Sequence, residues 1–283
     1  MKYSLLFYVL YFNNLFYFCA MFRKATFLLL IAGLLTVTFS CNGYQKTLKS
    51  SNNELKYETA IDLYEAGNFT RALQFFDILR AIHRGTPKGE LLTYYTANCY
   101  FQLKDYNIAS YYYKQYTQLY PRGEHVKEAA FTSAYCNYLD SPRSTLDQTS
   151  TFTALKELQD YIDQYPKDSR VKEATRLMDD LRDKLEIKDY DIAKMYYRME
   201  SYQAAIRSFE NLMEDYPDTD YREEIMYYIT KAYYEYAEKS IYTKKKVRYE
   251  KTIESYNNLK NQYPESEYLK EVESISANAR KHI

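Results

Sequence analysis

The 283-residue sequence predicts an all-α protein built from repeated helical hairpins. The dipeptide Tyr-Pro occurs four times in a chain with only six prolines, and each copy follows a small and then a bulky residue at constant spacing. Proline lacks an amide donor and bars the preceding residue from helical geometry, so each tyrosine is expected to end a helix. The four pairs are Tyr120-Pro121, Tyr165-Pro166, Tyr216-Pro217 and Tyr263-Pro264.

The residues before each Tyr-Pro pair predict an amphipathic helix. The small residue stands 12 positions before the proline and the bulky one 8 before it, so both lie on one face and admit a closely packed neighbour. The small residues are Ala109, Ala154, Ala205 and Thr252, and the bulky ones are Tyr113, Leu158, Phe209 and Tyr256. An earlier copy with Gly67, Ala72 and Phe76 fits the same template. The pattern is typical of the second helix of a tetratricopeptide (TPR) repeat, which predicts a TPR-type helical-hairpin superhelix of about five repeats.

The other elements follow from this frame. First helices are expected at residues 91–103, 128–139, 190–199 and 223–237, which are rich in alanine and aromatic residues and free of glycine and proline. Proline intervals longer than 34 residues place extra segments at 140–151, in an added helix at 171–187, and around 240–247. Ser169, Thr219 and Ser266 are candidates to cap the helices that follow. Residues 267–281 are expected to form the polar C-terminal capping helix that an open stack requires.

The N-terminal residues predict export and lipid anchoring. Arg23 and Lys24 precede an apolar run of signal-peptide length that leads into small residues and Cys41. This resembles a bacterial lipoprotein signal, in which the cysteine is lipidated; an ordinary cleaved signal is the alternative. Residues 1–40 are therefore expected to be leader and signal peptide, with translation from Met21. Residues 41–53 would be a lipidated tether too polar to pack, and residues 54–283 the TPR domain.

Composition argues against catalysis, metal binding and nucleic-acid binding. The chain has 38 basic and 38 acidic residues and no basic run that suggests nucleic acid. His83, His125 and His282 are scattered, and no metalloprotease, thiol-redox, hydrolase or phosphate-loop motif occurs. No catalytic residue, metal or cofactor is expected. Cys99 and Cys136 are expected to be buried apolar positions, with a disulfide between them as the alternative.

Two stretches resemble the BamD (YfiO) family, lipoproteins of the β-barrel assembly machinery in Gram-negative outer membranes. Residues 141–185 resemble the family's inserted loop, with its Asp147-Gln148 pair, and the long helix after it. Residues 189–219 resemble its fourth repeat, with Ala193, Tyr196, Ala204 and the closing Tyr-Pro-Asp-Thr. This chain departs from the family at Glu200, where a glycine-containing turn is usual, and in the basic run 242–251.

The resemblance implies a non-catalytic outer-membrane protein assembly factor whose domain stands in the periplasm. The C-terminal repeats, residues 124–283, would bind a BamA-like barrel insertase, with other accessory lipoproteins as further partners. The N-terminal repeats, residues 54–123, would receive unfolded outer-membrane proteins through their C-terminal β-signal. The partner interface is expected around Arg198, Arg207 and Glu210, where Arg207 lies one position from the family's interface arginine.

Helical spacing in the first two repeats aligns two sets of side chains as a candidate substrate-binding groove. They are Tyr57, Ile61 and Tyr64 in one helix, and Tyr94, Asn98 and Phe101 in the other. Such a trough would suit an extended apolar-aromatic segment, although the same periodicity is compatible with burial between helices. Two other classes stay open: a periplasmic TPR adaptor lipoprotein of another envelope complex, and a SusD-like glycan-binding lipoprotein. The second fits poorly, because the chain is short and has no tryptophan.

Overall fold

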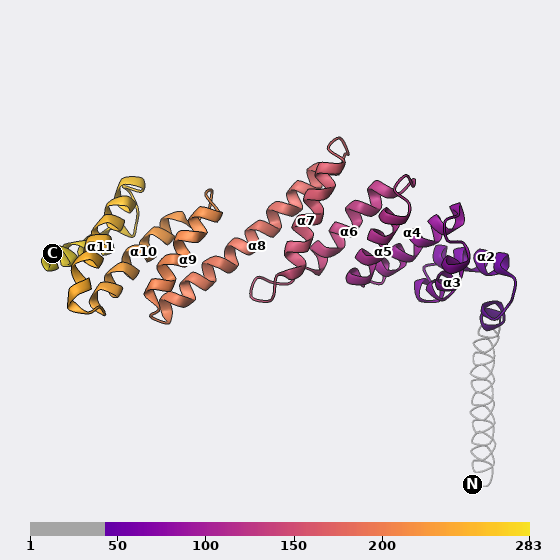
Figure 1. Ribbon diagram of the computed structural model, residues 1–283, viewed down its shortest axis with the longest axis horizontal. Coiled ribbons are helices and arrows are strands. Elements are labelled where there is room, and N and C mark those ends of the chain that lie inside the picture. The colour runs from indigo at the N-terminus through magenta and orange to yellow at the C-terminus, as the bar shows by residue number, and fades with distance from the viewer. Residues whose placement is uncertain (1–42) are drawn as a thin grey trace, which may run out of the picture. The chain divides into compact units, whose positions relative to one another are not determined.

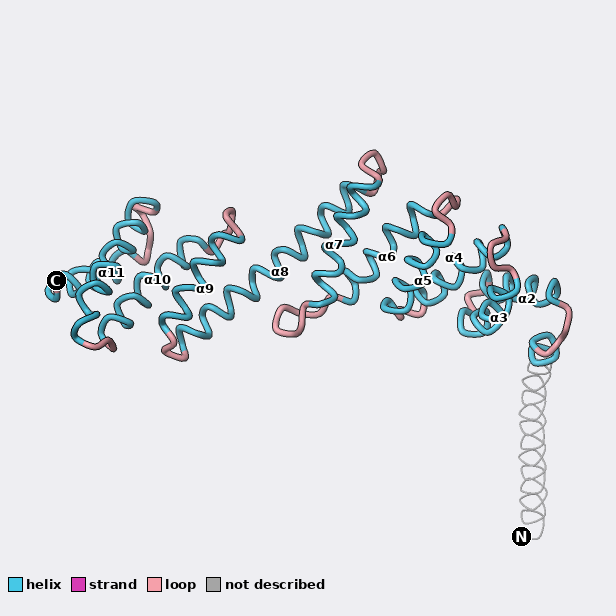
Figure 2. Tube along the Cα trace, viewed as in Figure 1, coloured by secondary structure: helices cyan, strands magenta, loops and turns pink. Residues whose placement is uncertain are grey.

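The computed structural model describes residues 43–283, which are helical with short turns between helices (Figures 1 and 2). This part of the chain forms two compact units, one ending at Ala129 and one beginning at Ala130. Within the described residues the helices pair into five hairpins, which confirms the predicted all-α, TPR-type architecture. The leader, the signal peptide and Cys41 lie outside the described residues.

The first unit contains two hairpins. They are formed by α2 (Asn53–Glu65) with α3 (Phe69–Ile82) and by α4 (Pro87–Gln102) with α5 (Tyr106–Leu119), and α3 also packs on α4. The predicted small and bulky positions of the first repeat, Ala72 and Phe76, are fully buried there together with Phe75 and Leu92. Removal of these apolar side chains from water is the main force that holds the hairpins together.

The expectation that residues 41–53 are too polar to pack is wrong for the part that is described. Residues 43–48 are helical, and the Tyr44 ring lies edge-on against Phe75 with centroids 5.4 Å apart. The Tyr44 hydroxyl donates a 2.8 Å hydrogen bond to Gln74 Oε1, and Leu48 packs against the same core. Tyr44 and Leu48 are four residues apart, which gives this polar segment one apolar helical face.

The second unit begins within α6 (Val126–Asp140) and continues through α7 (Thr149–Gln164) and α8 (Val171–Arg198). It is completed by α9 (Tyr202–Asp215), α10 (Arg222–Glu238), α11 (Tyr242–Gln262), α12 (Leu269–Ala279) and the short 3-10 helix η1 (Arg280–His282). The predicted capping helix is α12, which packs on α10 and α11.

Helix α8 corrects the prediction of an added helix at 171–187 followed by a separate helix at 190–199. The two are one continuous helix of 28 residues (Figure 1). Its first half packs through Leu177 and Leu181 on α7, and its second half packs through Tyr190 and Ala193 on α9 and α10. No glycine or proline lies between the two halves, so nothing in the sequence interrupts the helix.

The Tyr-Pro prediction is confirmed at all four positions. Helices end at Leu119, Gln164, Asp215 and Gln262, and the tyrosine that follows each has φ between −131° and −126°. Beyond the prolines, the hydroxyls of Thr219 and Ser266 accept bonds from backbone amides two residues on, as expected. Ser169 does not take this role. Its neighbour Asp168 accepts from the Arg170 amide instead.

Repeats one, two and four turn through the same left-handed backbone conformation between their two helices. Gly67 has φ 75°, and Lys104 and Glu200 take φ 62° and 60° at the equivalent position. Only glycine adopts this conformation without steric cost, so Lys104 and Glu200 carry local strain. The departure of this chain from a glycine-containing turn at Glu200 therefore leaves the turn geometry unchanged.

Candidate binding surfaces

Three of the residues predicted for the substrate-binding groove lie together around Tyr64 on α2. Its ring stacks on Tyr95 with centroids 4.6 Å apart and lies near Phe76, and all of Tyr57, Ile61 and Tyr64 are half-buried against the core. Lys88 Nζ lies 4.8 Å from the centre of the Tyr57 ring. Burial raises the pKa of the Tyr64 phenol to about 12, so this hydroxyl is neutral at physiological pH.

Tyr94 is part of the core and does not line an open trough, which corrects its prediction. It is only 6% exposed, because the His125 ring covers its face at a centroid distance of 4.2 Å. Tyr95, which the periodicity did not select, stands in its place beside Tyr64. We name the half-buried side chains Tyr57, Ile61, Tyr64 and Tyr95 the aromatic face.

The other two predicted groove residues are half-buried near the end of α4. Asn98 Oδ1 accepts a 3.4 Å hydrogen bond from Gln102 Nε2 on the same helix, and Phe101 packs against Tyr106 with centroids 5.9 Å apart. Asn98 carries the one amide group among the residues predicted for the groove.

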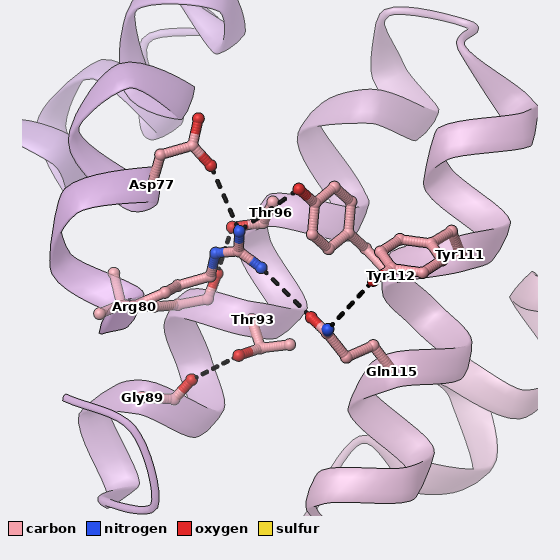
Figure 3. A network of polar contacts seen from close by, with 9 residues as sticks. Asp77, Arg80, Gly89, Thr93, Thr96, Tyr111, Tyr112 and Gln115 are labelled. Carbon is pink, nitrogen blue, oxygen red and sulfur yellow. Dashed lines mark hydrogen bonds and ion pairs between the residues drawn. The ribbon is translucent and has the colours of Figure 1, made fainter. Parts of the chain in front are cut away.

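Arg80 on α3 connects the first hairpin to the second (Figure 3). Its guanidinium donates to Gln115 Oε1 at 3.4 Å and to the Tyr112 hydroxyl at 3.3 Å, both on α5. It also stacks over the Tyr112 ring at 4.5 Å and pairs with Asp77 at 3.3 Å. A planar cation that bonds and stacks on the neighbouring repeat fixes the angle between the two hairpins.

Of the three residues predicted for the partner interface, two lie on the same helix and the third lies on another. Arg207 and Glu210 lie three residues apart on α9, and the Tyr233 hydroxyl donates a 3.1 Å hydrogen bond to Glu210 Oε1. Glu210 also lines a small cavity of about 180 Å³ with residues of α10 and α11. Arg207 is exposed beside this site. Arg198 is exposed in the last turn of α8, and within residues 43–283 no hydrogen bond or ion pair joins it to the other two.

A larger groove, which sequence reasoning did not find, lies along α8 beside the 141–148 loop. Its volume is about 950 Å³, and Met178, Leu185 and the exposed Phe152 supply apolar lining. Gln148 holds the loop in place, because its buried amide nitrogen donates to the carbonyls of Arg143 and Leu146 at 2.9 and 3.0 Å. The Asp147-Gln148 pair noted in the sequence thus lines this groove, as do Asp215 and Tyr216 at the end of α9.

The described residues offer little reactive chemistry. Cys99 and Cys136 are both free and buried, and burial raises the pKa of each thiol to about 12, which makes them poor nucleophiles. Among residues 43–283 there is no cluster of three or more side chains suited to a metal ion. None of the helices in this range is long and apolar enough to cross a bilayer.

Paired helical hairpins with half-buried aromatic and polar side chains define a TPR-type fold. Residues 49–249 match the family YfiO, described as an outer membrane lipoprotein, and this match extends over most of the chain. The chain therefore belongs to the YfiO family of outer membrane lipoproteins, as the insertion pattern predicted.

Individual relatives agree with this assignment. The chain is 26% identical over 186 residues to the outer membrane protein assembly factor BamD of Caulobacter vibrioides, and the match covers 64% of this chain and 59% of that protein. It is 24% identical over 212 residues to BamD of Rickettsia prowazekii, covering 72% and 83%. The chain thus spans less than two thirds of the Caulobacter relative. Among solved structures, the TPR2AB domain of yeast Sti1 has a TM-score of 0.37 at 9% identity, covering 81% of this chain and 98% of that one.

Proposed function

We propose that this chain is a non-catalytic outer-membrane protein assembly factor, held at the membrane by a lipid on Cys41 with its domain in the periplasm. The observation that carries the proposal is the family match over residues 49–249, together with relatives named as BamD. Stacked helical hairpins suit this role, because they present extended binding surfaces.

The first unit would bind the C-terminal β-signal of unfolded outer-membrane proteins. Such a signal is an extended segment rich in apolar and aromatic side chains. The aromatic face offers Tyr64 and Tyr95 as stacked rings with Ile61 beside them, and half-burial orders these side chains before the substrate arrives. The Asn98 amide and the neutral Tyr64 hydroxyl supply hydrogen-bonding groups for a substrate backbone.

The second unit would hold a BamA-like barrel insertase through the surface around Arg207 and Glu210. Arginine near the centre of an interface is a common source of binding energy. Beside Arg207, the hydrogen bond from Tyr233 holds the half-buried Glu210 carboxylate in a fixed position, where it could bind a group of the insertase. Because both units belong to one chain, a substrate bound to one unit and an insertase bound to the other would be tethered together, and this role requires no nucleotide.

Affinity purification of the tagged full chain from mildly solubilised outer membranes tests the proposal. We expect a large barrel protein with periplasmic domains to co-purify in near-equal amount. Recovery of envelope or division proteins without such a barrel protein would instead assign the chain to the adaptor class. The variant Arg207→Glu, with Lys172→Glu on the exposed side of α8 as the matched control, tests the interface itself.

A further inference from the structure

The start of α11, from its N-cap Ile241 to Val247, carries exposed side chains that are both apolar and basic. Ile241, Tyr242 and Val247 are 66%, 91% and 60% exposed, and they lie within seven residues of one another. Lys244 and Lys246 are exposed between them. We name these five residues the α11 tip. Single exposed apolar residues are common on proteins, but three in two turns, interleaved with lysines, are not a usual solvated helix end.

The charge around the tip is concentrated in sequence and in space. Six cations and a single carboxylate, Glu250, lie from position 239 to position 251, in a chain with 38 basic and 38 acidic residues in all. The 3-10 helix η1 packs beside α11, where His282 stacks on Tyr249 with centroids 4.6 Å apart. This contact brings the exposed Arg280 and Lys281 to the same region.

Some of these cations have structural partners and others do not. Arg248 stacks on the Tyr236 ring at 3.5 Å, and Lys245 lies 4.0 Å from Glu238. Within residues 43–283 no ion pair joins Lys244 or Lys246 to a carboxylate. These two lysines are therefore available to an external anionic surface.

The position of the lysines is unfavourable for the helix itself. The amino-terminal end of a helix carries the positive end of the helix dipole, so cations in its first turns are repelled and acidic residues are preferred there. Helix α11 has no acidic residue in its first turn and no side-chain cap. Residues that oppose local stability without compensation are expected at sites of function.

We propose that the α11 tip docks onto an anionic phospholipid surface, which goes beyond the assembly function proposed above. Lys244 and Lys246 would reach the lipid phosphates, while Tyr242, Ile241 and Val247 would enter the interfacial region. Aromatic rings with a polar tip and long lysine stems are the side chains that this region accommodates best. The family consists of outer membrane lipoproteins, so a membrane lies within reach of the chain. Glu250, one turn further along, limits the contact to the tip.

The absence of tryptophan from the sequence allows a direct test. The variant Tyr242→Trp places a single fluorophore in the tip, and Phe152→Trp places one at a side chain of α7 that is 59% exposed. The assay uses residues 41–283 with Cys41→Ser, so that no acyl chain contributes; every buried cluster described above lies within this range. The probes are phosphatidylethanolamine–phosphatidylglycerol vesicles, with or without brominated acyl chains, and phosphatidylcholine vesicles as the neutral control.

We expect tryptophan at position 242 to shift its emission to the blue and to be quenched by brominated lipid only in the anionic vesicles, with loss of both effects in high salt. The control tryptophan at position 152 should not respond. Because each lysine near the surface changes partitioning about fivefold, Lys244→Ala with Lys246→Ala should lower the partition coefficient about 25-fold. The matched pair Lys167→Ala with Lys172→Ala should change it less than twofold.

An equal response of the two tryptophans, or equal effects of the two lysine pairs, would overturn the proposal. The proposal would also be overturned if the α11 tip did not bind vesicles and the Lys244 and Lys246 variant no longer co-purified with the barrel protein. That result would assign the tip to a protein interface. Vesicle binding without any co-purifying barrel protein would support the membrane contact and refute only the assembly function.

Discussion

Replacement of Arg80 by alanine should loosen the joint between the first two hairpins. The side chain of Arg80 is 20% exposed, and its guanidinium both stacks on Tyr112 and bonds to α5. The stacking contributes about 1 kcal/mol at this degree of burial. The hydrogen bonds to Gln115 and Tyr112 are long, so each contributes at the lower end of the range of about 0.5–1.5 kcal/mol. The exposed pair with Asp77 adds little.

The loss in Arg80→Ala is therefore about 2 kcal/mol, and it should be local to α3, α4 and α5. Native-state hydrogen exchange measured by mass spectrometry resolves such a change by segment. A loss of about 2 kcal/mol corresponds to about 30-fold faster exchange of the protected amides in these helices, with α9 and α10 serving as an internal reference.

Two further variants separate the contributions. Arg80→Lys keeps the charge but loses the planar fork, and it should recover less than half of the protection. Arg84→Ala removes an exposed arginine from the turn before α4 and should change exchange less than threefold. Exchange in Arg80→Ala that matches the unmodified protein within threefold would refute the conclusion that this arginine fixes the joint.

Three other predictions follow from the turns and surfaces. Glu200→Gly should raise the free energy of unfolding by about 1 kcal/mol, because it relieves the left-handed strain. Gly67→Ala should lower it by a similar amount, although its added Cβ would meet no atom within 4 Å. Urea denaturation measures both, and a destabilised Glu200→Gly or a stabilised Gly67→Ala would contradict the strain argument. Hydrogen bonds from Arg170 hold the pKa of the Asp168 carboxyl well below its ordinary value, so this group stabilises the fold above pH of about 4, and the contribution is lost as the pH falls below that. Asp168→Asn should therefore lower the free energy of unfolding by about 2 kcal/mol at pH 7 and by progressively less below pH 4. A loss that does not depend on pH would refute this account. Arg207→Glu should lower recovery of the barrel protein about tenfold with unchanged circular dichroism, and full recovery would remove this residue from the interface.

The sequence specified the helix ends more reliably than it specified which side chains are accessible. Each Tyr-Pro pair is a local steric constraint, so the end of α5 at Leu119 could be predicted from the residues beside it. The spacing of the prolines shows that residues have been added before the fourth repeat, but it does not show whether they join the helix that follows; in α8 they do, and no residue within it breaks the helix. Helix periodicity locates a face but does not say what covers it.

The candidate groove shows this limit most clearly. Tyr94 and Tyr95 are adjacent in sequence, but Tyr94 is buried and Tyr95 is half-buried, because His125, from the turn before α6, covers Tyr94. That contact is set by the tertiary arrangement of a loop some 30 residues away, so helical spacing alone could not choose between the two tyrosines. Similarly, the groove along α8 depends on how Gln148 anchors the 141–148 loop, which the identity of the loop residues alone did not reveal.

Site-specific photo-crosslinking in living cells tests the central claim most directly, because it asks which proteins each unit touches. A photoreactive phenylalanine analogue at Ile61 in the aromatic face should crosslink to several unfolded outer-membrane proteins. The same analogue at Arg207 should crosslink to one large barrel protein in every preparation. If neither position captures a barrel protein, or if both capture the same envelope or division partner, the assignment of substrate and insertase surfaces to the two units is contradicted.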